Sequence, residues 1–69
     1  MRDLPIAIAA MFNRGHLTDI GQLSTNARAY LARAAKRGEV IRCRDYSWPR
    51  AKRAWMLPGW PWPLNVLPE

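Results

Sequence analysis

A helix pattern that stops at a glycine and is followed by two short strand patterns constrains this chain most. Basic and apolar residues alternate at helical spacing over residues 27–37, and three good N-cap residues, Ser24, Thr25 and Asn26, come directly before them. Gly38 suits the left-handed position that ends a helix. Residues 40–44 and 54–57 then follow as strand patterns separated by a basic loop. This order predicts an α+β domain with a β-hairpin after its last helix.

Two further helices are expected before residue 24. Asp3 is a plausible N-cap for a first helix over residues 4–14, in which apolar side chains fall on one face before Gly15 ends it. Thr18 or Asp19 can cap a short second helix that reaches about residue 23. A glycine at position 21 weakens that second helix by about 1 kcal/mol relative to alanine. The connection from residue 20 to residue 27 leaves room for a single helical turn.

The charge of the chain favours an anionic partner. The 69 residues form one small domain, with 11 Lys+Arg against 5 Asp+Glu and a formal net charge of +6. Such a balance points to nucleic acid first and to an acidic protein surface second. It does not determine the fold.

The residue inventory predicts a binding protein rather than an enzyme. One cysteine and one distant histidine do not form a disulfide or a zinc site. No catalytic triad, paired carboxylates or glycine-rich phosphate loop is present, so we expect no cofactor, no metal and no small-molecule substrate. No apolar run reaches the roughly 18 residues needed to span a bilayer, and the start of the chain makes a poor signal peptide. We expect a cytoplasmic protein with no membrane partner.

The chain ends in a segment rich in proline and tryptophan. Four of the six prolines in the chain lie from residue 58 onward. Proline is excluded from the interior of helices and from most strand positions. The sequence therefore predicts an extended, polyproline-like tail over residues 59–69 after a domain of residues 1–58. Two roles stay open for Trp60 and Trp62. They either seal the small core or form an aromatic docking surface for a partner protein or for homodimerisation.

Two basic segments are candidates for contacting nucleic acid. The first is the helix over residues 27–37, in which Arg28 and Arg33 lie off the apolar face and are long enough to reach bases or phosphates. The second is the loop over residues 45–53, which carries three cations suited to gripping phosphates. The alternative for both segments is a solvated basic surface that only aids solubility. Trp48 in the loop either packs over the hairpin or stacks on Arg50.

Residues 17–42 resemble the core of bacterial and phage winged-helix regulators. The resemblance rests on a Thr-capped second helix, an Arg-Xaa-Xaa-Leu third helix (Arg28 to Leu31) and the run Arg-Gly-Glu-Val at residues 37–40. The region of resemblance is followed by Trp-Met-Leu-Pro-Gly at residues 55–59, which is similar to the last wing strand of that group. The resemblance implies a compact three-helix winged helix-turn-helix with a two-stranded β-hairpin wing.

In function, the resemblance implies a double-stranded DNA-binding protein, a small transcription regulator of phage or mobile-element type. The helix over 27–37 would read the major groove, and the 45–53 wing would hold flanking phosphates. The alternative is a protein-binding module, such as a phage-encoded inhibitor or adaptor, that uses its basic face or its Trp-Pro tail. The DNA contacts implied are Thr25, Asn26, Arg28, Ala29, Arg33, Lys36, Arg50, Lys52 and Arg53.

Overall fold

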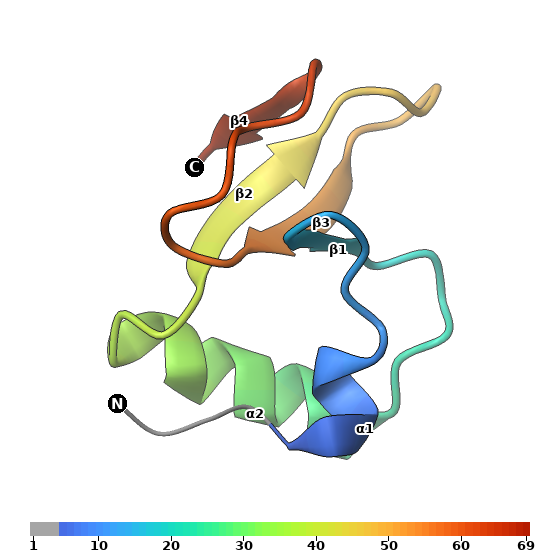
Figure 1. The fold of residues 1–69 in the computed structure, drawn as a ribbon. Coiled ribbons are helices and arrows are strands. Elements are labelled where there is room, and N and C mark those ends of the chain that lie inside the picture. The colour runs from blue at the N-terminus through green and yellow to red at the C-terminus, as the bar shows by residue number, and fades with distance from the viewer. Residues whose placement is uncertain (1–4) are drawn as a thin grey trace.

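The computed structural model describes residues 5–69, which form two helices packed against one four-stranded antiparallel sheet (Figure 1). The elements in chain order are α1 (Ile6–Ala9), β1 (His16–Thr18), α2 (Thr25–Lys36), β2 (Ile41–Asp45), β3 (Lys52–Met56) and β4 (Val66–Pro68). Neither described helix is long and apolar enough to cross a bilayer.

The sheet has the strand order β1-β3-β2-β4. Arg44 lies opposite both Arg53 of β3 and Leu67 of β4, and Trp55 lies opposite both Leu17 of β1 and Arg42 of β2. Directly opposed residues of antiparallel strands point to the same face, and successive residues alternate between faces. The face that carries Leu17 and Trp55 is called the helix side below. The face that carries Cys43 and Met56 is the tail side.

Helix α2 has clear start and stop signals. The Ser24 hydroxyl accepts a hydrogen bond from the Ala27 backbone N–H at 3.1 Å, which satisfies one of the free donors at the helix start. Gly38 follows the helix with a φ of 79°, as the left-handed ending requires. The helix buries Leu31 and Ala34 completely. The helix expected over residues 27–37 is therefore present, two residues longer at its start and one shorter at its end.

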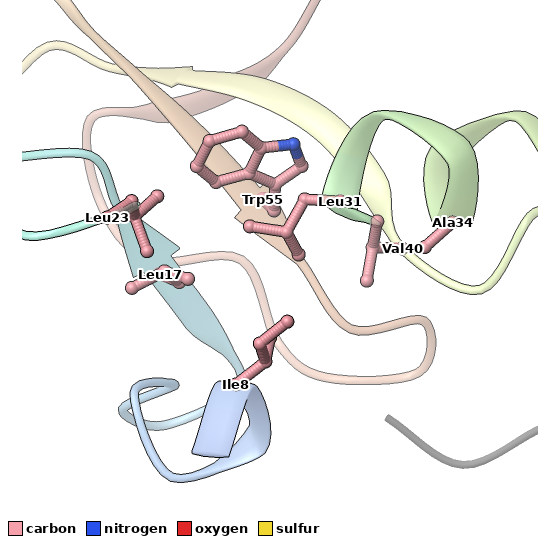
Figure 2. Close-up of a cluster of buried hydrophobic side chains, with 7 residues drawn as sticks. All are labelled: Ile8, Leu17, Leu23, Leu31, Ala34, Val40 and Trp55. Atoms are coloured by element: carbon pink, nitrogen blue, oxygen red, sulfur yellow. The ribbon is translucent and has the colours of Figure 1, made fainter. Parts of the chain in front are cut away.

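The helix side of the sheet is closed by α1 and α2. Leu31 and Ala34 of α2 pack with Trp55 and Leu17 of the sheet, and Ile8 of α1 closes one end (Figure 2). Burying side chains of this size contributes about 1.5–3 kcal/mol each. This cluster is the larger of the two cores of the described domain.

The tail side of the sheet has its own buried cluster. Cys43, Ala54, Met56 and Val66 are at most 2% exposed. Val66 comes from the C-terminal segment, which leaves β3, runs beside β2 and returns as β4 (Figure 1). The C-terminal segment is therefore part of the fold.

The expectation of a three-helix winged helix with a two-stranded wing is wrong, because the described chain has two helices and a four-stranded sheet. The second helix does not form. In its place Gly21 takes a φ of 92°, and its N–H donates to the Asp19 carboxylate at 3.1 Å. The Ile20 N–H donates to the Gln22 side chain at 3.1 Å. These local hydrogen bonds to side chains take the place of the backbone hydrogen bonds that a second helix would form.

The first helix and the tail also differ from expectation. The first helix was expected over residues 4–14, but α1 covers only Ile6–Ala9, and the expected cap Asp3 lies outside the described residues. The tail was expected to be extended throughout, but Val66–Pro68 pairs with β2 as an edge strand. Proline is tolerated there because an edge strand has one set of unpaired backbone groups. Between the two helices, His16–Thr18 forms the strand β1, which pairs with β3.

Candidate nucleic-acid interface

Three exposed arginines line the helix side of the sheet beyond the area that the helices cover. Arg42 and Arg44 alternate with buried residues along β2, and Arg53 lies on β3 directly opposite Arg44. Opposed residues have Cβ atoms about 4.5–5.5 Å apart, and like charges in that arrangement are destabilising. We call Arg42, Arg44 and Arg53 the sheet arginines. The fold therefore maintains a repulsive contact at this place.

The sheet arginines have few close carboxylate partners. Among residues 5–69, no carboxylate forms a salt bridge with Arg44 or Arg53. Arg42 has a long ion pair, 3.5 Å between Nη2 and Glu69 Oε1, in which both side chains are partly exposed. An exposed pair of this kind contributes at most about 1 kcal/mol. The three arginines are thus available to an anionic ligand.

Asp19 connects the β3 backbone at Arg53 to α2. Its Oδ2 accepts a bond from Arg28 Nε at 3.0 Å, and its backbone N–H donates to the Arg53 carbonyl at 2.8 Å. The Arg28 hydrogen bond lowers the pKa of Asp19 below its ordinary value, with smaller contributions from the Gly21 N–H and the charges of Arg28 and Arg53, against the opposing effect of burial. Arg28 therefore anchors the 19–24 loop to the helix.

Helix α2 presents a second group of polar side chains. Asn26, Ala29, Arg33 and Lys36 are exposed and follow one another at intervals of three and four residues, so they form one stripe. Lys36 also lines, with Arg42, a hollow of about 520 Å³ at the C-terminal end of the helix. Lys36 of α2 and Arg42 of the sheet are therefore neighbours at that end.

The hairpin loop is organised around the buried carboxylate of Asp45. This carboxylate accepts hydrogen bonds from Thr18 Oγ1 at 2.8 Å, from the Ser47 N–H at 2.9 Å and from Trp48 Nε1 at 3.3 Å. Burial raises the pKa of Asp45, but the bonds from Ser47, Thr18 and Trp48 outweigh it and leave the pKa below its ordinary value. Asp45 thus holds the loop against β1 as an ionised acceptor.

Lys52 and Trp48 are used inside this loop. The Lys52 ammonium lies 5.4 Å from the centre of the Trp48 ring, a cation–π contact. Stacking on Arg50 was one of the two alternatives for Trp48, and the cation found there is Lys52. In the strand register Lys52 lies opposite Asp45, on the tail side. The loop cations therefore do not act as one group, because Lys52 and Arg53 point to opposite faces of the sheet.

Cys43 is the one cysteine of the chain, and it lies in the core on the tail side. Burial raises the pKa of the Cys43 thiol to about 11, and the charges of Asp45 and Glu69 add to that effect. The thiol is fully buried, so it is a packing residue and a poor nucleophile. Within residues 5–69, no three His, Cys, Asp or Glu side chains gather as a metal site.

The structure thus brings some of the predicted contact residues together and separates others. Arg33 and Lys36 lie on the outer stripe of α2 with Asn26 and Ala29, and Thr25 is exposed at the helix start. Arg28, expected as a DNA contact, forms an ion pair with Asp19.

Sequence reasoning missed two of the sheet arginines. Arg42 and Arg44 alternate around Cys43, a period-two signal that both belong to one face of a strand. Arg53, which was expected as a wing contact, joins them only through the strand register. The alternation could have placed Arg42 and Arg44 together, but the pairing with Arg53 depends on a register that the sequence does not reveal.

Comparisons with protein-family models, with curated proteins and with solved structures each found no match for this chain.

Proposed function

We propose that this protein binds double-stranded DNA through its phosphate backbone, with the sheet arginines as the main contacts and Lys36 of α2 beside Arg42. The observation that carries the proposal is the opposed pair Arg44 and Arg53, next to Arg42, with no salt-bridge partner for either member of the pair in residues 5–69. A phosphate between two arginines would convert a repulsive contact into an attractive one.

The composition of the chain supports the same ligand. The net charge of +6 raises the local concentration of any polyanion. Arginine binds phosphate through a planar fork of donors and is the preferred side chain for this contact. Residues on one face of a strand recur about every 6.6 Å, so Arg42 and Arg44 present a repeated charge along β2. A repeated charge suits a polymer of phosphates better than a single small anion.

The outer stripe of α2 supplies a second contact in this proposal. This stripe carries residue types that form hydrogen bonds with base edges and phosphates, namely Asn26, Arg33 and Lys36. The short side chain of Ala29 between them would let the helix backbone come close to the DNA. In this proposal the helix gives the protein a preference for particular DNA sequences, whereas the sheet arginines supply most of the affinity for any duplex. Regulation of transcription is the role that such a binder would serve.

Salt-titrated binding to a random DNA duplex tests the proposal. Each neutralised phosphate contributes about −0.9 to the slope of log K against log salt, so three or four contacts predict a slope of about −3 to −4. Replacing the opposed pair (Arg44→Gln with Arg53→Gln) should weaken binding to all sequences and flatten the slope by about two. The same change removes a like-charge contact, so the melting temperature should not fall.

A charge-matched control distinguishes a defined surface from overall charge. The pair Arg14→Gln and Lys52→Gln removes two cations from the tail side, where Arg14 lines a hollow with His16 and Lys52 lies opposite Asp45. It should leave the slope close to that of the parent chain. Equal losses in the two double variants would show that only net charge matters. No binding to duplex DNA at about 50 mM salt would overturn the proposal, because non-specific binding is strongest at low salt.

A further inference from the structure

A second surface lies on the tail side, away from the sheet arginines. It is a pocket of about 500 Å³, lined by Arg14 and His16 on one side and by residues 60–64 on the other. We call it the tail pocket. His16 lies opposite Met56 in the sheet and alternates with Leu17, so it belongs to the tail side. Pockets of roughly 300–1,000 Å³ are the size that encloses a small ligand or an anchoring side chain.

The tail pocket is apolar and is held in shape by its neighbours. Gly15 has a φ of 84°, and a Cβ atom there would lie 2.3 Å from Cγ of Trp60, so the Trp60 ring packs directly on the Gly15 backbone. Pro61 between the two tryptophans and Pro63 directly after them restrict the backbone of this segment. Trp60 and Trp62 are nevertheless 49% and 41% exposed, and Leu64 is 87% exposed. A preformed aromatic surface loses little freedom on binding.

Two polar features lie in the same pocket. Arg14 has a φ of 53°, a left-handed conformation that is strained for arginine, and it forms no salt bridge with the described residues. His16 keeps a buried Nδ1 atom for which no hydrogen-bond partner exists in residues 5–69. The pocket therefore combines an aromatic wall with a cation that has no ion-pair partner among the described residues.

We propose that the tail pocket binds a peptide segment of a partner protein in which an apolar side chain is flanked by carboxylates. The apolar side chain would lie against Trp60, Trp62 and Leu64, and a carboxylate would pair with Arg14. Tryptophan and arginine are the residue types that contribute most energy at protein interfaces. The net charge of +6 attracts an acidic segment. A second copy of this chain would instead bring another strongly basic surface to Arg14.

An NMR titration of the full ¹⁵N-labelled chain tests this proposal. The probe is the peptide acetyl-Glu-Asp-Leu-Phe-Asp-Glu-amide, and the matched control peptide has Lys at each acidic position. Each of the four tryptophans has one indole N–H group and so contributes one signal. The acidic peptide should shift the signals of Trp60 and Trp62 and leave that of Trp55, which is 2% exposed, in place. The basic peptide should shift none of them.

Two variants leave the fold intact and remove one feature each. Leu64→Ser changes an exposed side chain, and Arg14→Gly places glycine where the backbone is already left-handed. Each variant should bind the acidic peptide with an affinity lower by about fivefold or more, which is the loss typical of a significant interface residue. Arg50→Gln, which removes an exposed cation from the hairpin loop, should leave the affinity unchanged. Thermal melts check that all three variants are folded.

Several results would overturn the proposal. They are equal shifts with the acidic and basic peptides, no shift of Trp60 and Trp62 at any soluble peptide concentration, and unchanged affinity in Leu64→Ser and Arg14→Gly. Signals that move with protein concentration alone would assign the pocket to a second copy of the chain. Shifts of the same two indoles by duplex DNA, with none from the peptide, would assign it to nucleic acid.

Discussion

The two faces of the sheet are covered in different ways. On the helix side, seven buried residues pack between the strands and the two helices, and α2 supplies Leu31 and Ala34 at regular helical spacing. On the tail side, four buried residues form a smaller cluster, and its contribution from outside β2 and β3 is Val66 of the C-terminal segment. One core therefore relies on a periodic helix and the other on an irregular, proline-rich segment. Both are needed to bury a sheet of this size.

Deletion of residues 59–69 should cause the largest loss of stability, because it uncovers the tail side of the sheet. It removes β4, the buried Val66 and the Trp60 ring that packs on Gly15. A buried large side chain contributes about 1.5–3 kcal/mol, and a domain of this size has only a small stability margin. We expect the shortened chain to lose cooperative thermal unfolding by circular dichroism. A melting temperature equal to that of the full chain would show that the tail side needs no cover.

Alanine substitutions at Leu31 and Met56 compare the two cores directly. Both side chains are fully buried, Leu31 on the helix side and Met56 on the tail side. Each change should lower the free energy of unfolding by about 2–5 kcal/mol, because it removes transfer energy and leaves a cavity. Urea unfolding measures both values. A loss at Met56 far smaller than the loss at Leu31 would mean that the tail side is loosely packed.

Gly15→Ala tests the contact between the tail and the rest of the sheet. The new Cβ would meet the Trp60 ring and would also occupy a left-handed backbone position. The left-handed backbone should lower the free energy of unfolding by about 1–2 kcal/mol. The clash with the Trp60 ring should lower it by about 1–3 kcal/mol more. Gly38→Ala is the control, because its backbone is also left-handed but no atom lies within 4 Å of the added Cβ. Equal losses in the two variants would contradict a close Gly15–Trp60 contact.

Asp45→Asn should have a smaller effect that depends on pH. Because the folded pKa of Asp45 is depressed, its carboxylate stabilises the fold above the unfolded pKa of about 3.9, and this stabilisation is lost as pH falls through the lower folded value. The variant should lose about 1–3 kcal/mol at pH 7. The difference from the parent chain should shrink in acid, as measured by urea unfolding at a series of pH values. A difference that stays constant with pH would contradict an ionised Asp45.

The periodic parts of the fold could be predicted from the sequence. The expected helix over 27–37 appears as α2, with Ser24 as its cap and Gly38 after its end, because both signals are local. The two strand patterns appear as β2 and β3, each displaced by one or two residues. Local propensity and turn chemistry were enough for these elements.

The non-local parts of the fold could not be predicted. The fourth strand depends on Val66 finding a buried place opposite Asp45, a contact between distant residues that no local pattern encodes. The second helix failed because Asp19 and Gln22 bond their own backbone neighbours, and Asp19 also pairs with Arg28. The candidate site was predicted in part for the same reason. Arg33, Lys36 and Arg53 were named, whereas the pairing of Arg44 with Arg53 needed the register.

An NMR titration of the full chain with duplex DNA tests the central claim that the helix side, through its sheet arginines, binds nucleic acid. The account predicts that the backbone amide and guanidinium signals of Arg42, Arg44 and Arg53 move at low salt and return when salt is added. The indole signals of Trp60 and Trp62 on the tail side should stay in place. Shifts confined to the tail side, or no shift of the three arginines at low salt, would contradict the account.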